Sequence, residues 1–143
     1  MSVKLTPIDV QMPRRCGELC VALALETFAE EFLFTMQDVA PKRSGDMARG
    51  LYLRQVGRFE YVVDGTEEYT DAVLYGHRRF WVEPKSGGVL HWQQGAIDVF
   101  SKGHWIPETE PQRFDLRAQD IERARLPTYV GEAAAIVRRR GRC

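Results

Sequence analysis

The chain has 143 residues, of which 44% are hydrophobic and 28% are charged. A chain of this length fits one domain, and its composition supplies both a core and a hydrated surface, which excludes a wholly disordered or membrane-embedded protein. Its 20 basic residues balance its 20 acidic residues. No overall positive field therefore attracts DNA or an anionic membrane surface, and any contact with nucleic acid has to be local.

Apolar runs and cysteines indicate the compartment. The longest apolar run, Cys20–Leu25, is far shorter than the roughly 20 residues that a membrane span needs. The N-terminus also lacks the basic-then-apolar pattern of a signal peptide. The three cysteines, Cys16, Cys20 and Cys143, are sparse and odd in number. They predict free thiols in a reducing cytoplasm.

A long helix is predicted from Pro13 to about Val39, after an N-terminal arm of residues 1–12. Proline suits the first turn of a helix, and the next proline, Pro41, prevents the helix from continuing. Apolar side chains recur at steps of three and four residues, which indicates one buried face. These side chains are Cys16, Leu19, Cys20, Leu23, Phe28, Phe32 and Met36.

Three further apolar residues of this helix, Leu25, Phe34 and Val39, lie outside that stripe. They favour a helix that is covered on more than one side, as it would be if a neighbouring subunit packed on it. The segment Ala40–Asp46 then combines proline, glycine and polar residues, which predicts a turn.

The middle of the chain predicts an antiparallel meander. Short runs rich in β-branched and aromatic residues alternate there with glycine, proline and other turn residues. The predicted strands are Leu51–Val56, Phe59–Asp64, Phe80–Glu83, Val89–Trp92 and Ile97–Phe100. The short segment Tyr69–Tyr75 between them fits either a helix or a further strand.

A second helix is predicted from Phe114 to about Ala124, with Leu116, Ala118 and Ile121 on its buried face. The order of elements predicts an α+β domain over residues 13–126. In it, a long N-terminal helix and a C-terminal helix pack on a mostly antiparallel sheet that carries an extended hairpin. Residues 127–143 are predicted to form a C-terminal tail.

The end of this tail is basic, and its arginines could meet phosphate, although such a run also fits a solvated chain end. They are Arg138, Arg139, Arg140 and Arg142.

The histidines His77, His91 and His104 are the only obvious candidates for a metal site or a catalytic base. They form no helix-spaced pair and belong to no known spacing of metal ligands. The chain also contains no phosphate-binding glycine loop, nucleophile elbow or dinucleotide fingerprint. The sequence therefore predicts no catalytic, cofactor-binding or metal-ligating residue.

Aromatic residues concentrate in the meander, where Trp81, Trp92 and Trp105 accompany Phe80 and Phe100. Such side chains could stack on bases or sugars. Few basic residues are interleaved with them, so a role in the core or in a subunit contact is favoured.

Four segments in a fixed order carry a family resemblance. The first is Ala40–Met47, where the long helix runs into Ala-Pro-Lys-Arg-Ser-Gly-Asp-Met, and the second is the tyrosine-led Tyr69–Gly76. The third, Glu83–Lys102, contains Pro-Lys, Val-Leu-His-Trp and Asp-Val-Phe-Ser-Lys. The fourth, Ile106–Ala118, is a proline-rich link into the second helix. Together they resemble the small neck proteins of long-tailed bacteriophages, also described as tail-completion, minor tail or virion morphogenesis proteins.

The resemblance covers roughly residues 14–125 and departs from the family pattern in places. Ser44 and Met47 stand where the family has threonine and leucine, and the glutamate that commonly precedes the glycine at the position of Gly76 is absent. No single segment is specific, so the shared order and spacing carry the resemblance.

What the resemblance implies is a structural virion protein without enzymatic activity or cofactor. It would form a hexameric or dodecameric ring of identical copies in the head-to-tail connector, or neck, or in the tail-completion or tail-terminator ring. Neighbouring neck and tail proteins would be its partners, with a possible local contact to DNA in the channel and none to membrane. It would reside in the virion and, during assembly, in the host cytoplasm.

Exposed loops carry recognition, so the turn after the long helix, the Glu83–Lys102 hairpin and the link to the second helix supply candidates for partner contacts. The candidates are Pro41, Ser44, Gly45, Lys85, Trp92, Phe100, Lys102, Pro107 and Phe114. The same loops could also be ordinary connections.

Two other functions stay open from the sequence. One is a small metal-dependent enzyme whose site is assembled from His77, His91 and His104 with Glu83 and Asp98. The other is a phage-encoded inhibitor of a host protein, which could equally be small, neutral and free of motifs.

Overall fold

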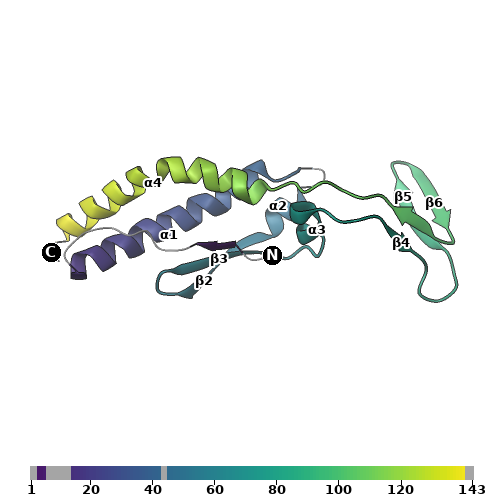
Figure 1. Cartoon of the computed structure of the whole chain (residues 1–143), viewed down its shortest axis with the longest axis horizontal. Helices are drawn as coiled ribbons and strands as arrows, with labels where there is room; N and C mark the ends of the chain where they lie inside the picture. Colours follow the sequence, from purple (N-terminus) through teal and green to yellow (C-terminus); the bar gives the residue numbers. More distant parts are fainter. Residues whose placement is uncertain (1–2, 6–13, 43–44, 141–143) are drawn as a thin grey trace. The chain divides into compact units, whose positions relative to one another are not determined.

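The computed structural model describes residues 3–5, 14–42 and 45–140, with the side chains of residues 3–5, 14 and 15 left out. The described residues form four helices and seven strands, and every strand pairing among them is antiparallel (Figure 1). The predicted α+β class is confirmed.

The chain divides into two compact units where the length suggested a single domain. One unit, here called the helical unit, comprises Met1–Thr70 and Arg113–Cys143. The other, here called the ribbon unit, comprises Asp71–Gln112.

Helix α1, Arg14–Val39, is the centre of the helical unit, and its predicted bounds are confirmed to within one residue. It lies between helix α4 and the sheet and contacts both (Figure 1). Its buried side chains are Cys20, Ala24, Leu25, Phe28, Ala29, Phe32 and Met36. Of the three apolar residues outside the predicted stripe, Leu25 is covered by the same chain, whereas Val39 is half-buried and Phe34 is 64% exposed.

Helix α4, Phe114–Arg139, is much longer than predicted, because it continues through Pro127. Proline removes one helical hydrogen bond, but residues on the following turns are buried, and Ala133 and Val137 pack with Cys20 and Ala24 of α1. This packing compensates for the missing hydrogen bond, and the helix continues past Pro127. Residues 127–139, predicted as tail, thus belong to the helical unit.

The predicted buried face of α4 is also wrong in part. Leu116 and Ile121 are exposed, whereas Ala118 is buried as expected. The buried face includes polar residues as well: Phe114, Asp115, Ala118, Glu122, Tyr129, Ala133 and Val137. A count of apolar spacing alone could not find it.

The helical unit contains a three-stranded sheet in the order β1-β3-β2. Strands β2, Leu51–Gly57, and β3, Glu60–Gly65, form the predicted hairpin. Strand β1, Val3–Leu5, lies within the predicted N-terminal arm and pairs with β3. A short helix that was not predicted, α2 at Asp46–Gly50, begins at the last residue of the predicted turn.

The ribbon unit is a nested hairpin. Helix α3, Thr70–Tyr75, leads into it and resolves the open choice at this segment in favour of a helix. The outer strands β4, Phe80–Val82, and β7, His104–Ile106, pair with each other. The inner strands β5, Leu90–Gln94, and β6, Ile97–Ser101, do the same. Strand β7 was not predicted, and the expected meander is replaced by two two-stranded sheets.

The cysteines differ from one another. Cys20 is a buried free thiol, as predicted. The prediction of a free thiol is wrong for Cys16, which is disulfide-bonded. The prediction relied on the odd number of cysteines, but three cysteines can still form one disulfide and leave one free thiol. Cys143 lies outside the described residues.

Candidate functional site

The ribbon unit has almost no core of its own. Leu74 is its one buried side chain, and the structure describes every residue of the unit. Its large apolar side chains are exposed instead: Tyr75, Phe80, Trp81, Val89, Ile97, Phe100 and Trp105. An isolated two-stranded hairpin is only marginally stable in water, and clustered exposed apolar side chains mark surfaces that contact other molecules. The ribbon unit is therefore the principal candidate site.

One face of the outer strand pair carries two tryptophans and an arginine. Trp81 lies directly opposite Trp105, and their rings meet edge to face with centroids 5.5 Å apart. The guanidinium of Arg79 lies 4.3 Å from the centroid of the Trp105 ring, a cation–π contact. About half of each indole is exposed, 48% of Trp81 and 51% of Trp105. We call Arg79, Trp81 and Trp105 the arginine–tryptophan face.

Gly103 allows Trp81 to lie close to the backbone. A Cβ atom at this position would be 2.5 Å from Cζ2 of the indole, so any other residue would displace the ring. The Ser101 hydroxyl holds the bend at Gly103, because it accepts a hydrogen bond from the Gly103 N–H at 3.1 Å and donates one to the Gly103 carbonyl at 2.8 Å. The backbone at Gly103 thus packs against the Trp81 ring and helps to fix its position.

The inner strands carry a stacked pair. The His91 ring stacks on Phe100 with centroids 4.6 Å apart, and its Nε2 lies 2.9 Å from Oδ1 of Asp98. Both members of the His91–Asp98 pair are about half exposed. Such a pair contributes little to stability, but it orients the imidazole on an exposed surface.

The three histidines do not come together as the metal-enzyme hypothesis requires. His77 contacts Phe80, whereas His104 contacts Trp92 and His91 contacts Phe100. Among the described residues, no group of three or more His, Cys, Asp or Glu side chains could hold a metal ion. Glu83 and Asp98 are among these residues, so the composite site is not formed.

The chain segments that lead into and out of the ribbon strands pair with each other at His77 and Thr109. His77 and Thr109 exchange backbone hydrogen bonds of 3.0 and 3.3 Å. Gly76, at the end of α3, has φ +70°, and a Cβ there would lie 2.4 Å from the Thr109 carbonyl oxygen. Glycine is required on both grounds. An open depression of about 270 Å³ lies beside this junction, lined by residues 75–78 and 108–110.

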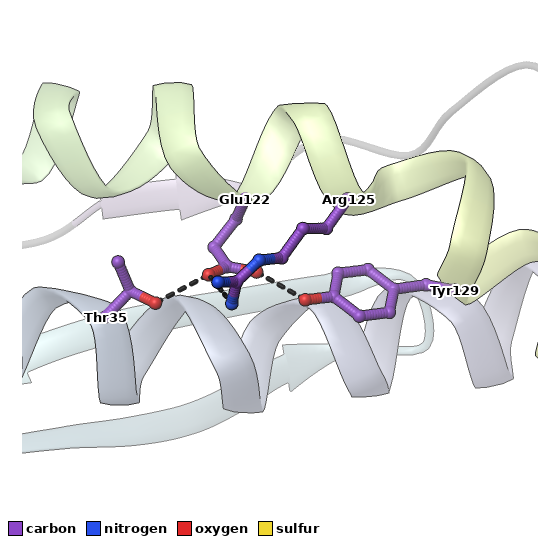
Figure 2. Close-up of polar contacts among 4 residues, drawn as sticks. All are labelled: Thr35, Glu122, Arg125 and Tyr129. Carbon is purple, nitrogen blue, oxygen red and sulfur yellow. Dashed lines mark hydrogen bonds and ion pairs between the residues drawn. The ribbon is translucent and has the colours of Figure 1, made fainter.

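A buried polar cluster joins the two long helices of the helical unit (Figure 2). The carboxylate of Glu122 on α4 is completely buried. Its Oε1 accepts hydrogen bonds from the Thr35 hydroxyl of α1 at 2.6 Å and from Nη1 of Arg125 at 3.2 Å. Its Oε2 accepts one from the Tyr129 hydroxyl at 2.5 Å. Both oxygens are therefore satisfied, as a buried charge requires.

The phenol of Tyr129 responds to this environment. Burial, followed by the hydrogen bond to Glu122 and the negative charge of that carboxylate, raises the pKa of Tyr129 to about 12. The Glu122 carboxylate is completely buried, and the Thr35 hydroxyl joins it to α1, so the cluster fastens α1 to α4.

The sequence analysis missed Glu122. The available signal was the spacing of Glu122, Arg125 and Tyr129, which places all three near one face of a helix. A helix that ended near Ala124 would have left Tyr129 outside it.

A second buried carboxylate stands at the start of α4. Asp115 accepts hydrogen bonds from Nε of Arg113 at 2.9 Å and from Nη2 at 2.7 Å. Burial acts to raise the pKa of Asp115, but the Arg113 hydrogen bond, the Leu116 backbone N–H and the Arg113 charge outweigh burial and hold it below its usual range.

Most predicted contact residues of the ribbon unit are accessible. Lys85, Phe100, Lys102 and Pro107 are exposed, and Trp92 is half-buried. One prediction requires correction: Phe114, the first residue of α4, is completely buried and belongs to the core. It is apolar and begins a packed helix, so burial is the physically favoured outcome.

The predicted contact residues after α1 belong to the helical unit. Pro41 and Gly45 are half-buried, while Ser44 lies outside the described residues. Of the terminal arginines, Arg138, Arg139 and Arg140 are exposed around the end of α4. Arg142 lies outside the described residues.

Within the part of the chain that the structure describes, no helix combines the length and apolar character that crossing a bilayer requires. Comparison with known protein families, curated proteins and solved structures finds no match for this chain. The ribbon unit, with its exposed apolar side chains, remains the principal candidate site.

Proposed function

We propose that this chain is a structural protein that acts by protein–protein contact, and that it serves in the head-to-tail connector or the tail-completion ring of a tailed-phage virion. The observation that carries the first part is the ribbon unit, whose large apolar side chains are exposed and whose core is almost absent. The resemblance of the four ordered segments to small neck proteins supports the second part.

The two units suit different tasks in such a protein. The helical unit buries a set of apolar side chains between α1, α4 and the sheet, which gives it a core within one chain. The ribbon unit gains stability when its exposed tryptophans and phenylalanines are covered. Tryptophan and arginine are also the residues on which binding energy concentrates in protein interfaces.

The loop and hairpin lysines provide a test of this function. Lys85 and Lys102 are exposed in the ribbon unit, so Lys85→Glu with Lys102→Glu should leave the isolated fold intact. Exposed charges contribute only about 0 to 1 kcal/mol to folding, whereas like charges brought together at an interface cost several kcal/mol. We therefore expect the yield of infectious particles to fall in a complementation assay, with unjoined heads and tails visible by electron microscopy.

A matched control reverses two exposed charges of the helical unit, Arg117→Glu with Arg123→Glu on α4. This control should lower the particle yield less than the lysine reversal does. Equal losses from both pairs would remove the special role of the ribbon unit. A normal yield after deletion of the whole gene would contradict the virion function itself.

A further inference from the structure

The helical unit carries a surface that complements the arginine–tryptophan face. Glu26, Glu30 and Phe34 follow one another at four-residue steps, so they form a line along α1. All three are exposed, and Phe34 is 64% exposed. Within the described part of the chain, neither glutamate makes an ion pair. We call these three residues the acidic stripe.

We propose that the arginine–tryptophan face of one copy docks on the acidic stripe of a second copy. This inference rests on the proposed function, in that both require the ribbon unit to contact protein, and it names the partner as the chain itself.

The chemistry of the two surfaces matches in two respects. Arg79 presents positive charge at the ring of Trp105, its neighbour in the chain, Arg78, adds a second exposed positive charge, and Glu26 and Glu30 present unpaired negative charge. The half-exposed indoles supply apolar area that the exposed ring of Phe34 can cover. A contact of this kind combines aromatic anchors with charge pairs that set its orientation.

Nucleic acid fits the same face less well. The ribbon unit has four basic residues, Arg78, Arg79, Lys85 and Lys102, against five acidic ones. It therefore lacks the excess positive charge on which phosphate binding depends.

The proposed contact joins two different surfaces of the same chain. Such a head-to-tail contact leaves one free surface of each kind at the ends of any open chain of subunits. Repetition of the contact closes a ring if the rotation between copies permits it, and otherwise it extends.

Charge reversal on the full-length protein tests the contact. The stripe variant carries Glu26→Arg with Glu30→Arg, and the face variant carries Arg78→Glu with Arg79→Glu. Sedimentation over a concentration series measures association. Tryptophan fluorescence reports cover of the face, because all three tryptophans of the chain, Trp81, Trp92 and Trp105, lie in the ribbon unit.

Wild-type protein should associate as its concentration rises, with a blue shift of tryptophan emission. Each variant alone should associate at least about tenfold more weakly, because like charges then meet at the contact. An equimolar mixture should regain association, since the face of each variant meets a stripe of opposite charge on the other. Unchanged melting temperatures check that the variants fold.

Two single reversals on α4, Glu132→Arg and Arg123→Glu, serve as controls, because both residues are exposed and lie outside the two surfaces. They should leave association unchanged. A wild-type protein that stays monomeric at every concentration overturns the inference, and so does a mixture that fails to recover. A blue shift that does not depend on concentration would indicate docking within one chain and would also overturn it.

Failure of the inference and failure of the proposed function can be told apart. If wild-type protein stays monomeric while deletion of the gene still stops particle formation, the inference is wrong and the virion function stands. If the protein associates through the two surfaces while the deletion leaves particle yield normal, the self-contact stands and the virion function is wrong.

Discussion

The helical unit and the ribbon unit use aromatic residues in opposite ways. In the helical unit, Phe28 and Phe32 stack in the core with ring centroids 6.1 Å apart, and Phe32 is completely buried. In the ribbon unit, Trp81 and Trp105 also contact each other, yet about half of each ring remains exposed. Aromatic pairing therefore does not itself indicate a core, because the second layer that would cover the rings decides between core and contact surface.

Polar groups show the same difference at Glu122, which is buried in the helical unit, and at the His91–Asp98 pair, which is exposed in the ribbon unit. Glu122 is fully buried and accepts hydrogen bonds on both oxygens, so loss of a partner would leave a buried group unsatisfied. His91 and Asp98 lie in the open, where water can replace either partner. The helical unit should thus be sensitive to single substitutions that the ribbon unit tolerates in the isolated protein.

The largest expected effect is that of removing a core phenylalanine. Phe32→Ala should lower the free energy of unfolding by about 3 to 5 kcal/mol, and Phe28→Ala should act in the same range. Phe100→Ala in the ribbon unit should cost less than about 1 kcal/mol, because that ring is already exposed. Denaturant unfolding followed by far-ultraviolet circular dichroism measures all three. Losses below about 1 kcal/mol at both core positions would show that the assigned helix face is wrong.

Removing the buried carboxylate should come next. Glu122→Ala strands the Thr35 and Tyr129 hydroxyls between α1 and α4, and we expect a loss of about 3 kcal/mol, the lower end for breaking a buried ion pair. The half-exposed guanidinium of Arg125 can turn to water and should limit the cost. Glu132→Ala, on an exposed face of the same helix, is the control and should change stability by less than about 0.5 kcal/mol. If Glu122→Ala and Glu132→Ala lowered the free energy of unfolding equally, the cluster would not stabilise the packing of α1 on α4.

The ribbon unit offers a matched pair of glycines, Gly76 at the junction with Thr109 and Gly87 in the turn between β4 and β5. Gly76 and Gly87 have nearly the same φ, +70° and +71°, but only Gly76 has backbone close to its missing Cβ. Gly87→Ala should cost only the strain of the left-handed conformation, about 1 kcal/mol. Gly76→Ala adds a clash with the Thr109 carbonyl and should cost about 2 to 3 kcal/mol, confined to the ribbon unit.

Tryptophan fluorescence would show that loss, while the helical circular dichroism transition would stay in place. If the helical transition moved as far as the fluorescence signal, the two units would unfold as one.

The smallest expected effect concerns pH. The pKa of Tyr129 is raised to about 12, from about 10 in an unfolded chain. A raised pKa means that the folded state holds the proton more tightly, so this contribution is fully present below about pH 10 and is lost as pH rises toward 12. The stability difference between wild type and Tyr129→Phe should therefore shrink across that interval. In a titration followed by tyrosinate absorbance, the step at the highest pH belongs to Tyr129 and should be absent from Tyr129→Phe.

Much of the fold could be predicted because the signals are local. Pro13 and Pro41 bracket α1, and the three- and four-residue spacing between them marks its buried face. The β2–β3 hairpin follows from two strand-forming runs around Gly57 and Arg58. The α+β class follows from the order of these elements, and each signal depends only on residues close in sequence.

The candidate site could be predicted only in part. The concentration of aromatic residues between residues 80 and 105 was visible, as was its favoured role in a core or a contact. Which of the two applies depends on whether another layer covers the rings, and no local pattern specifies that. The prediction for Phe114 failed for the same reason, since a residue next to a proline-rich link can still begin a packed helix.

Tertiary structure alone decided the rest. Helix α4 continues through Pro127 because Tyr129, Ala133 and Val137 pack on α1. The residues in this contact are far apart in the sequence. Glu122 becomes the centre of a buried cluster only because Thr35 is brought beside it. Residue spacing expresses the preferences of one segment, whereas burial and charge pairing depend on which segments meet.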